Sequence, residues 1–292
     1  MATGPDQNCA PIAPETRLRQ VRVGLAGRGI QLSRTPAMHI AEGRAHGLDY
    51  RYDLLDPDAM EGAPSLRQII ETAEAEGFAG LNVTFPFKRE VIALLDDLSS
   101  AAQKVGAVNT VVFANGKRRG HNTDFWGFAE SLRRGLPDAP RACALLLGAG
   151  GAGGAVAHAL RDVGVADLMI FDQSAEAAGN LADAVGGRAV SDLEAAARMA
   201  DGIVNATPMG MAKLPGTAID TALLAPRHWV ADIVYFPRET ALLAHARAKG
   251  CRVLDGSGMA VFQAVRAFEL FTGLQPDAAR MRATFETLNE TN

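Results

Sequence analysis

The stretch Leu146-Leu147-Gly148-Ala149-Gly150-Gly151-Ala152-Gly153-Gly154 follows the apolar run 143–147 and opens an alanine-rich segment. Gly148, Gly150 and Gly153 have the spacing of a dinucleotide-binding loop. In such a loop the first glycine permits a tight turn after a strand, the second lets the backbone approach a pyrophosphate, and the third lets the helix pack close to the sheet. The apolar run before it and the helical segment after it favour this interpretation over a flexible loop.

The cofactor phosphates are expected at the start of the helix that follows this loop, because free N–H groups and the helix dipole favour an anion there. The residues of the loop predicted to contact the cofactor are Gly148, Ala149, Gly150, Gly151, Ala152 and Gly153.

Asp172 ends the next predicted strand, where an acidic residue can bond the ribose hydroxyls of the adenosine. A carboxylate there repels the 2′-phosphate of NADP, and its neighbours Gln173 and Ser174 supply no cation. The sequence therefore favours NAD, with NADP the less favoured cofactor. The alternative is that Asp172 only caps the helix that begins near Ser174.

Short strand-like runs alternate with helical segments along the whole chain, which indicates parallel α/β sheets. Asn115-Gly116 is a strong turn signal and predicts a hairpin between 108–113 and the segment before His121. The other strands are predicted over 21–26, 50–54, 80–83, 143–147, 168–172, 202–205, 229–234 and 252–254. Helices are predicted over 38–46, 66–76, 88–95, 125–134, 152–163, 175–185, 240–249, 259–271 and 276–288.

The bulk composition is that of an ordinary globular protein, with 292 residues, 48% apolar residues and a net charge of −4. This length suggests two domains. The charge balance argues against nucleic-acid and membrane partners. The segment 1–17 lacks an apolar signal core and is interpreted as a loose arm.

The three cysteines Cys9, Cys143 and Cys251 are too scattered for a disulfide framework or a zinc site, and free thiols fit the cytoplasm. Cys143 lies in an apolar run and is interpreted as a small core residue. The dispersed His39, His121 and His158 give no spacing that would predict a metal site.

Four segments ahead of the glycine loop place polar residues at strand ends or in turns, where α/β proteins hold their ligands. They are Leu32-Ser33-Arg34-Thr35-Pro36-Ala37-Met38-His39, Gly80-Leu81-Asn82-Val83-Thr84-Phe85-Pro86-Phe87-Lys88, Gly106-Ala107-Val108-Asn109-Thr110 and Gly120-His121-Asn122-Thr123-Asp124.

Together these segments resemble the shikimate dehydrogenase family. The resemblance extends from about residue 21 to 281 and includes Val204-Asn205-Ala206-Thr207-Pro208-Met209-Gly210-Met211, Asp232-Ile233-Val234-Tyr235-Phe236-Pro237 and Gln263-Ala264. It implies a two-domain α/β fold with a central cleft. We expect a discontinuous substrate domain over 18–123 plus 259–292 and a Rossmann domain over 124–258.

Lys88 and Asp124 match the catalytic pair of the family. A desolvated lysine can exchange a proton with an alcohol near neutral pH, and the carboxylate would hold the lysine. Burial favours the neutral amine whereas the carboxylate favours the ammonium, and the sequence does not decide between them. Alternatively, Lys88 is a solvated residue at a helix start and Asp124 an N-cap.

Ser33 and Thr35 are expected to bind the substrate carboxylate, since alternate residues of an extended segment share one face, and Tyr235 is a third candidate. A helix-capping role is the alternative for Thr35. The resemblance implies that Asn82, Thr84, Asn109, Thr123 and Gln263 bond the ring hydroxyls. It also implies that Asn205, Ala206, Thr207, Met209 and Gly258 lie along the middle and the nicotinamide end of the cofactor.

Asp172 without a following arginine, and Ser33 paired with Thr35, resemble the NAD-using quinate/shikimate branch. The typical biosynthetic enzyme has serine at both positions and an NADP signature, and where the family sometimes has a histidine before the glutamine this chain has Phe262. The implied activity is reversible NAD-dependent oxidation of shikimate, quinate or both to the 3-dehydro ketone, in aromatic amino acid biosynthesis or quinate catabolism. A homodimer is left open.

Three alternatives remain. An enzyme of the same family could act on an analogue such as aminoshikimate, which the sequence separates poorly. A folate-type dehydrogenase also pairs a lysine with a Rossmann domain but has no need for Ser33, Thr35 or Asp124. A non-catalytic NAD-responsive regulator would not need an intact set of Lys88, Asp124, Asn109 and Gln263.

Overall fold

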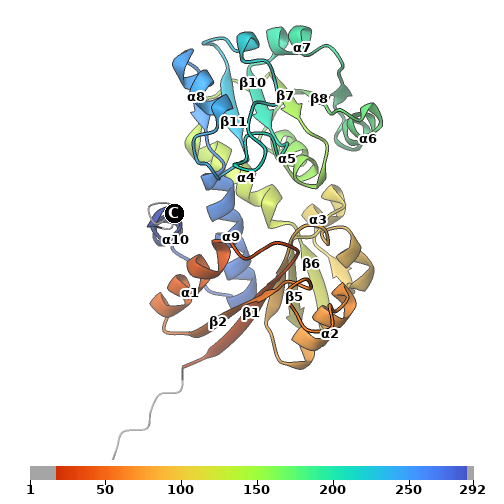
Figure 1. Ribbon diagram of the computed structural model, residues 1–292, viewed down its shortest axis with the longest axis vertical. Coiled ribbons are helices and arrows are strands. Elements are labelled where there is room, and N and C mark those ends of the chain that lie inside the picture. Colours follow the sequence, from red (N-terminus) through yellow and green to blue (C-terminus); the bar gives the residue numbers. More distant parts are fainter. Residues whose placement is uncertain (1–17, 288–292) are drawn as a thin grey trace, which may run out of the picture.

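Two six-stranded sheets form two lobes, with the first in the lower and the second in the upper half of Figure 1. The computed structural model describes residues 18–287. The sheet of the first lobe has the order β2-β1-β3-β5-β6-β4. Its strands are β1 (Gln20–Ala26), β2 (Asp49–Leu55), β3 (Gly80–Val83), β4 (Asp97–Leu98), β5 (Thr110–Ala114) and β6 (Lys117–His121).

The sheet of the second lobe has the order β12-β11-β10-β7-β8-β9, and all of its strands are parallel. Its strands are β7 (Cys143–Leu147), β8 (Asp167–Phe171), β9 (Arg188–Ala189), β10 (Gly202–Asn205), β11 (Trp229–Asp232) and β12 (Arg252–Leu254). The order reverses direction at β7, which is the strand that leads into the glycine loop. In open α/β sheets ligands bind at the carboxyl ends of strands at such a point.

Helices cover both faces of each sheet. In the first lobe, α1 (Thr35–Ala45), α9 (Ser257–Thr272) and α10 (Ala278–Thr287) pack on one face, whereas α2 (Leu66–Ala75), the 3₁₀ helix η1 (Glu90–Leu94) and α3 (Ser100–Val105) lie toward the other. In the second lobe, α4 (Thr123–Gly135), α5 (Gly151–Asp162) and α6 (Ala175–Val185) share one core, and α7 (Leu193–Met199) and α8 (Ala241–Ala248) share another. The 3₁₀ helix η2 (Thr221–Leu223) completes the second lobe.

The predicted two-domain α/β class is confirmed, and so is the predicted hairpin around Asn115-Gly116, although the sequence did not show that the first sheet would be mixed. There β5 pairs antiparallel with both β3 and β6. The reason is the hairpin at Asn115-Gly116, where Asn115 and Gly116 adopt φ values of 54° and 69°. A two-residue turn of this kind can join only antiparallel strands.

The helices α4 and α9 pass between the two lobes and pack closely on each other (Figure 1). Two glycines permit this approach. A Cβ at Gly127 would lie 2.8 Å from the backbone N of Gln263 and from the carbonyl O of Met259. A Cβ at Gly258 would lie 2.0 Å from the Oγ of Ser131. Gly258 is therefore required where α9 begins, whatever it contributes to a ligand.

Several predicted boundaries differ from those observed. Residues 88–95, expected to form an α-helix, form a turn followed by η1, and the strand expected over 229–234 ends at Asp232. The helices α3 and α7 were missed because each spans two turns or fewer and shows little periodicity. The predicted arm 1–17 and the last residue of the helix predicted over 276–288 lie outside the described residues.

Between residues 18 and 287 the structure contains no helix with both the length and the apolarity that a bilayer crossing requires.

Candidate active site

Lys88 and Asp124 form an ion pair in which Nζ lies 2.6 Å from Oδ2. Lys88 lies in the turn that follows β3, and Asp124 lies in the first turn of α4. Asp124 does not cap this helix, because Asn122 holds the N-cap position and its Oδ1 accepts from the N–H of Phe125. With side chains 24% and 13% exposed, the pair is partly desolvated yet open to a ligand.

Tyr235 lies in the loop that follows β11, and its ring packs edge-on against Phe285. Desolvation raises the pKa of Tyr235, and Asp124 adds to the rise whereas Arg34 and Lys88 oppose it. These three charges from the first lobe and from α4 are therefore close enough to act on a tyrosine of the second lobe. The residue as a whole is 39% exposed.

A buried network of amides and hydroxyls adjoins the ion pair. The Oδ1 of Asn109 accepts from the N–H of Thr123 at 2.7 Å, and the Nδ2 of Asn109 donates to the Oγ1 of Thr123 at 2.9 Å. The Nδ2 of Asn82 donates to the Oγ1 of Thr110 at 3.0 Å and to the carbonyl O of Asn109 at 3.4 Å. The OH of Tyr52 donates to the Oδ1 of Asn82 at 2.8 Å. Three predicted site residues thus lie in one network that ends beside Asp124.

Ser33 directly follows a turn and Thr35 begins α1, and the backbone of Arg34 between them is helical, so the expected extended segment was wrong. The two residues are still neighbours, since the N–H of Thr35 donates to the Oγ of Ser33 at 3.4 Å. Thr35 does not cap α1, because Arg34 holds the N-cap position without a capping side-chain bond.

The remaining polar candidates of the first lobe lie close to the same elements. Thr84 follows β3 directly, and its N–H donates to the carbonyl O of Ala26 at 2.9 Å. Gln263 lies against Gly127 of α4, and its Nε2 donates to the carbonyl O of Ala260 at 3.0 Å. Both side chains are half-buried.

The glycine loop connects β7 to α5. Gly148 has a φ of 103°, in the region that favours glycine. A Cβ at Gly153 would lie 2.2 Å from the carbonyl O of Gly148, so the third glycine is required by close packing. Gly150 and Gly151 are exposed, and a Cβ at either would meet nothing within 4 Å. The loop therefore leaves open space at the start of α5, as the pyrophosphate of a dinucleotide requires.

Asp172 bonds directly to this loop. Its Oδ2 accepts from the N–H of Ala149 at 2.7 Å, and its Oδ1 accepts from the N–H of Ser174 at 2.9 Å. The N-cap of α6 is Ser174, whose Oγ accepts from the N–H of Ala177. The helix-capping alternative for Asp172 is therefore wrong, and its carboxylate lies beside the predicted phosphate loop.

The predicted contacts that follow β10 form an internal scaffold. The Nδ2 of Asn205 donates to the Oδ1 of Asp232 and to the carbonyl O of Met209, both at 2.9 Å. The Oδ1 of Asn205 accepts from the Oγ1 of Thr207 at 2.7 Å. A Cβ at Gly148 would lie 3.0 Å from the backbone of Ala206. These bonds hold the segment after β10 against the glycine loop.

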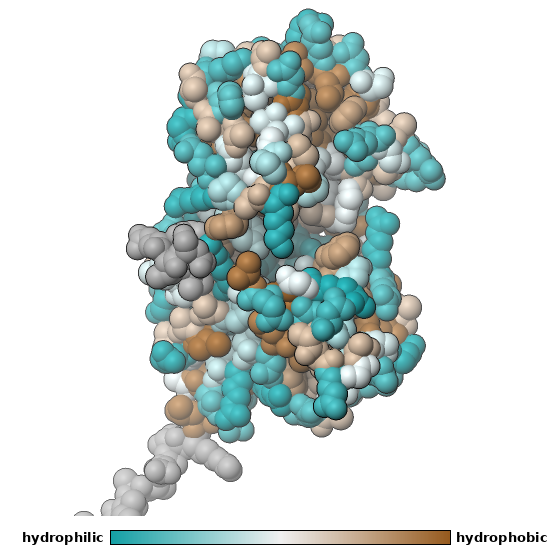
Figure 2. Space-filling model, in the orientation of Figure 1, coloured by the Kyte–Doolittle hydropathy of each residue, from teal (hydrophilic) through white to brown (hydrophobic). Residues whose placement is uncertain are grey.

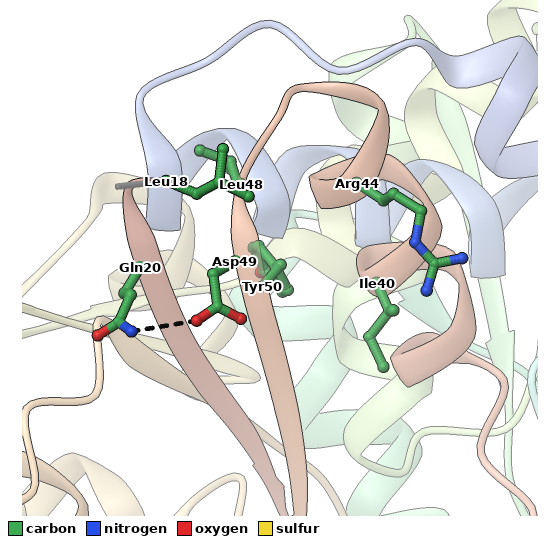
Figure 3. A pocket seen from close by; sticks show the side chains of 7 residues that line it. All are labelled: Leu18, Gln20, Ile40, Arg44, Leu48, Asp49 and Tyr50. Carbon is green, nitrogen blue, oxygen red and sulfur yellow. Dashed lines mark hydrogen bonds between the residues drawn. The ribbon is translucent and has the colours of Figure 1, made fainter. Parts of the chain in front are cut away.

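The space-filling view shows a hollow between the two lobes, and α4 and α9 lie at the same level in the ribbon view (Figures 1 and 2). Two cavities lie elsewhere. One of about 470 Å³ is lined by residues of β1, β2 and α1, including Ile40, Arg44 and Tyr50 (Figure 3). The other, of about 500 Å³, contains Phe262, whose ring lies against Arg134 and Arg282 rather than the Lys88–Asp124 pair. In the described part of the chain no cluster of three His, Cys, Asp or Glu side chains could hold a metal ion.

Sequence reasoning missed three residues that orient predicted site residues through hydrogen bonds. Tyr52 and Thr110 bond the amide of Asn82, and Asp232 bonds the amide of Asn205. Tyr52 lies two residues after Tyr50 on β2, and the sequence alone does not distinguish it from an aromatic residue of the core. Thr110 and Asp232 lie within quoted motifs, yet only the fold shows which side chains they bond.

Comparison with known protein families gives two matches. Residues 25–111 match the shikimate dehydrogenase substrate binding domain, and residues 256–284 match the shikimate 5′-dehydrogenase C-terminal domain.

Comparison with individual proteins agrees. The chain is 51% identical over 280 residues to a quinate/shikimate dehydrogenase (NAD⁺) of Corynebacterium efficiens, covering 92% of this chain and 98% of the relative. It is 50% identical to a shikimate dehydrogenase (NADP⁺) of Streptomyces avermitilis, covering 91% and 95%. The structure of quinate dehydrogenase from Corynebacterium glutamicum in complex with NAD is similar with a TM-score of 0.88 and 47% identity, covering 92% and 99%.

Proposed function

Since the chain belongs to the shikimate dehydrogenase family, we propose that it catalyses the reversible NAD-dependent oxidation of shikimate, quinate or both to the 3-dehydro ketone. The observation that carries this proposal is the partly exposed pair of Lys88 and Asp124, whose Nζ and Oδ2 lie 2.6 Å apart and whose charges act on Tyr235 of the other lobe. This pair supplies an acid/base group between a polar network for a polyol and a loop for a dinucleotide.

In the direction of oxidation, the amine of Lys88 takes the proton of the substrate hydroxyl. Asp124 lies within hydrogen-bonding distance of Nζ and stabilises the ammonium that this transfer produces. In the reverse direction the ammonium returns the proton to the ketone oxygen. NAD, when bound, accepts the hydride from the carbon that carries the reacting hydroxyl.

The substrate is oriented by groups on both sides of this pair. We propose that Ser33 and Thr35, with Tyr235, hold the carboxylate, and that Asn82, Thr84, Asn109, Thr123 and Gln263 bond the ring hydroxyls. Support comes from the network that joins Asn82, Asn109 and Thr123, which is buried and so costly to leave unsatisfied.

The open space at Gly150 and Gly151 fits the pyrophosphate of the cofactor, and Asp172 beside the loop favours NAD. Because the side chains of Asn205 and Thr207 are engaged with each other, with Met209 and with Asp232, we propose that they shape the nicotinamide end through the backbone of 206–209. Relatives of nearly equal similarity carry NAD and NADP names, so Asp172 is the more specific support.

We also propose that the substrate domain spans 18–123 plus 259–292 and the Rossmann domain 124–258, with α4 and α9 as the joint. The described thiols Cys143 and Cys251 are buried and free, which supports a cytoplasmic location. The proposed activity requires only small-molecule partners. It applies equally to a monomer and to a homodimer.

Initial rates with shikimate and quinate, each against NAD and NADP, test the function. NAD-linked oxidation of at least one substrate, with a clear preference over NADP, is expected. Turnover of neither substrate by a protein that binds NAD would contradict the activity while leaving the cofactor proposal intact.

A further inference from the structure

The orientation of the Asn82 amide is fixed from two sides. The carbonyl O of Asn109 can only accept, so the amide nitrogen of Asn82 must face it, and this nitrogen also donates to Thr110. The opposite side of the amide meets the OH of Tyr52 at 2.8 Å. Burial raises the pKa of Tyr52 well above its ordinary value, so this group stays a phenol and can donate.

The side chain of Asn82 has one hydrogen-bonding site that no group of the described residues occupies. Both N–H groups of its amide are used, and its Oδ1 has accepted one of two bonds. A ligand can therefore meet only an acceptor at Asn82. If the amide were reversed, its oxygen would face the carbonyl O of Asn109 and would repel it.

Asn109, in contrast, keeps an unused hydrogen-bond donor. Its Oδ1 accepts from the main-chain N–H of Thr123 at 2.7 Å, which fixes the amide. One N–H of Nδ2 donates to the Oγ1 of Thr123, and we find no acceptor for the second N–H among residues 18–287. Asn109 therefore offers a ligand one donor.

We propose that Tyr52 is a positioning residue that sets substrate specificity, because it locks Asn82 as an acceptor next to the donor of Asn109. A hydroxyl group both donates and accepts and satisfies this pair, whereas a ketone only accepts and an ammonium group only donates. The pair thus recognises a ring hydroxyl other than the one being oxidised, and it rejects an amine in that place. The inference rests on the proposed function and selects polyols over amino analogues.

The ring of Tyr52 is itself held in place. It meets the ring of His39 edge-on with centroids 5.2 Å apart, and Tyr50, two residues earlier on β2, bonds the Nδ1 of His39 at 2.9 Å. Burial lowers the pKa of His39 to about 3, so its ring is neutral in the physiological range. Tyr50 and Tyr52 are thus two buried phenols on one strand, and only Tyr52 reaches the polar network.

The experiment compares Tyr52→Phe with the matched variant Tyr50→Phe in steady-state rates with shikimate, quinate and aminoshikimate. For Tyr52→Phe the KM for the favoured polyol should rise about tenfold, with kcat and the KM for NAD within about twofold, because a bond that orients the ground state is lost. The preference of the enzyme for the hydroxyl over the amine should fall by a similar factor.

Tyr50→Phe loses a buried phenol of the same kind and should lower Tm comparably while leaving KM and the preference unchanged. The inference is overturned if Tyr52→Phe behaves in the same way in an active enzyme. If Tyr52→Phe fails to fold, Thr110→Val and Thr110→Ser act on the same amide from its other side and on Asn109, whose Oδ1 lies 3.2 Å from the Oγ1 of Thr110. Thr110→Val should raise KM and Thr110→Ser should preserve it, and equal KM values would overturn the inference. A wild-type protein that oxidises neither polyol would overturn both the proposed function and this inference.

Discussion

Lys88 and Asp124 lie 36 positions apart in sequence, yet their side chains meet at 2.6 Å. The motifs suggested both residues separately, and each had a plausible structural role of its own. The fold removes one of these, because Asn122 rather than Asp124 caps α4. What brings the two charges together is the path of the chain from β3 through the hairpin to the start of α4.

Replacing Lys88 by Ala should reduce kcat by about 10²- to 10⁴-fold, because Lys88 is the proposed acceptor of the hydroxyl proton. Substrate binding, measured by calorimetry, should weaken only modestly, since the proposed contacts to the carboxylate and the ring hydroxyls come from other residues. The neighbouring Arg89 is exposed, so Arg89→Ala is the matched control and should keep its turnover. Unchanged turnover of Lys88→Ala would remove its acid/base role.

Replacing Asp172 by Ala should weaken NAD binding more than NADP binding, because the proposed role of its carboxylate is to bond the ribose hydroxyls and to repel a 2′-phosphate. Dissociation constants for both cofactors provide the measurement. Ser174→Ala removes the N-cap of α6 but keeps the carboxylate, so it should affect both cofactors equally. Equal losses for Asp172→Ala would mean that its bonds to Ala149 and Ser174 only shape the loop.

At the scale of elements, α4 and α9 join the two lobes. Their contact depends on glycines that nothing in the sequence marks as packing residues. Gly127 sits in the middle of α4, where glycine costs stability unless close packing requires it. The sequence predicted both helices from periodicity but not their contact.

Gly127→Ala should lower the free energy of unfolding by about 1–3 kcal/mol, because the new Cβ would press on backbone atoms of α9. Gly179→Ala is the matched control, since Gly179 lies within α6 and a Cβ there meets nothing within 4 Å. That substitution should stabilise the protein by about 0.5–1 kcal/mol. Thermal unfolding of both variants should therefore shift Tm in opposite directions, and shifts of the same sign would contradict the packing argument.

At the scale of the whole molecule, acid should destabilise the protein through buried histidines. His39 is fully buried among Tyr50, Tyr52, Phe268 and Phe271, and burial lowers its pKa from 6.5 to about 3. The unfolded chain thus binds a proton below pH 6.5 that the native state does not bind until about pH 3. Stability is complete above pH 6.5 and decreases as the pH falls through that window, by about 1.4 kcal/mol per pH unit for each such histidine.

His39→Phe should flatten this dependence between pH 6 and pH 5, even though losing the bond to Tyr50 lowers stability at pH 7. Urea unfolding at pH 7, 6 and 5 gives the slopes. Desolvation also lowers the pKa of His121, to about 4, so a residual slope should remain in the variant. Identical slopes for the variant and the wild type would show that His39 does not contribute.

The sequence by itself determined the class of the fold, because periodicity, the glycine loop and the Asn115-Gly116 turn are local signals that hold wherever the segment lies. It also supplied most of the site candidates, because a polar residue that follows a predicted strand can be recognised without knowing the fold. The tertiary structure decided which candidates meet. It placed Asp172 on the glycine loop, and it bonded the side chains of Asn205 and Thr207 to each other and to the backbone of Met209. It also revealed Tyr52 behind Asn82. Whether a hydrogen-bonding group is already bonded or still available to a ligand depends on partners that are distant in sequence. Only the folded chain brings those partners within about 3 Å.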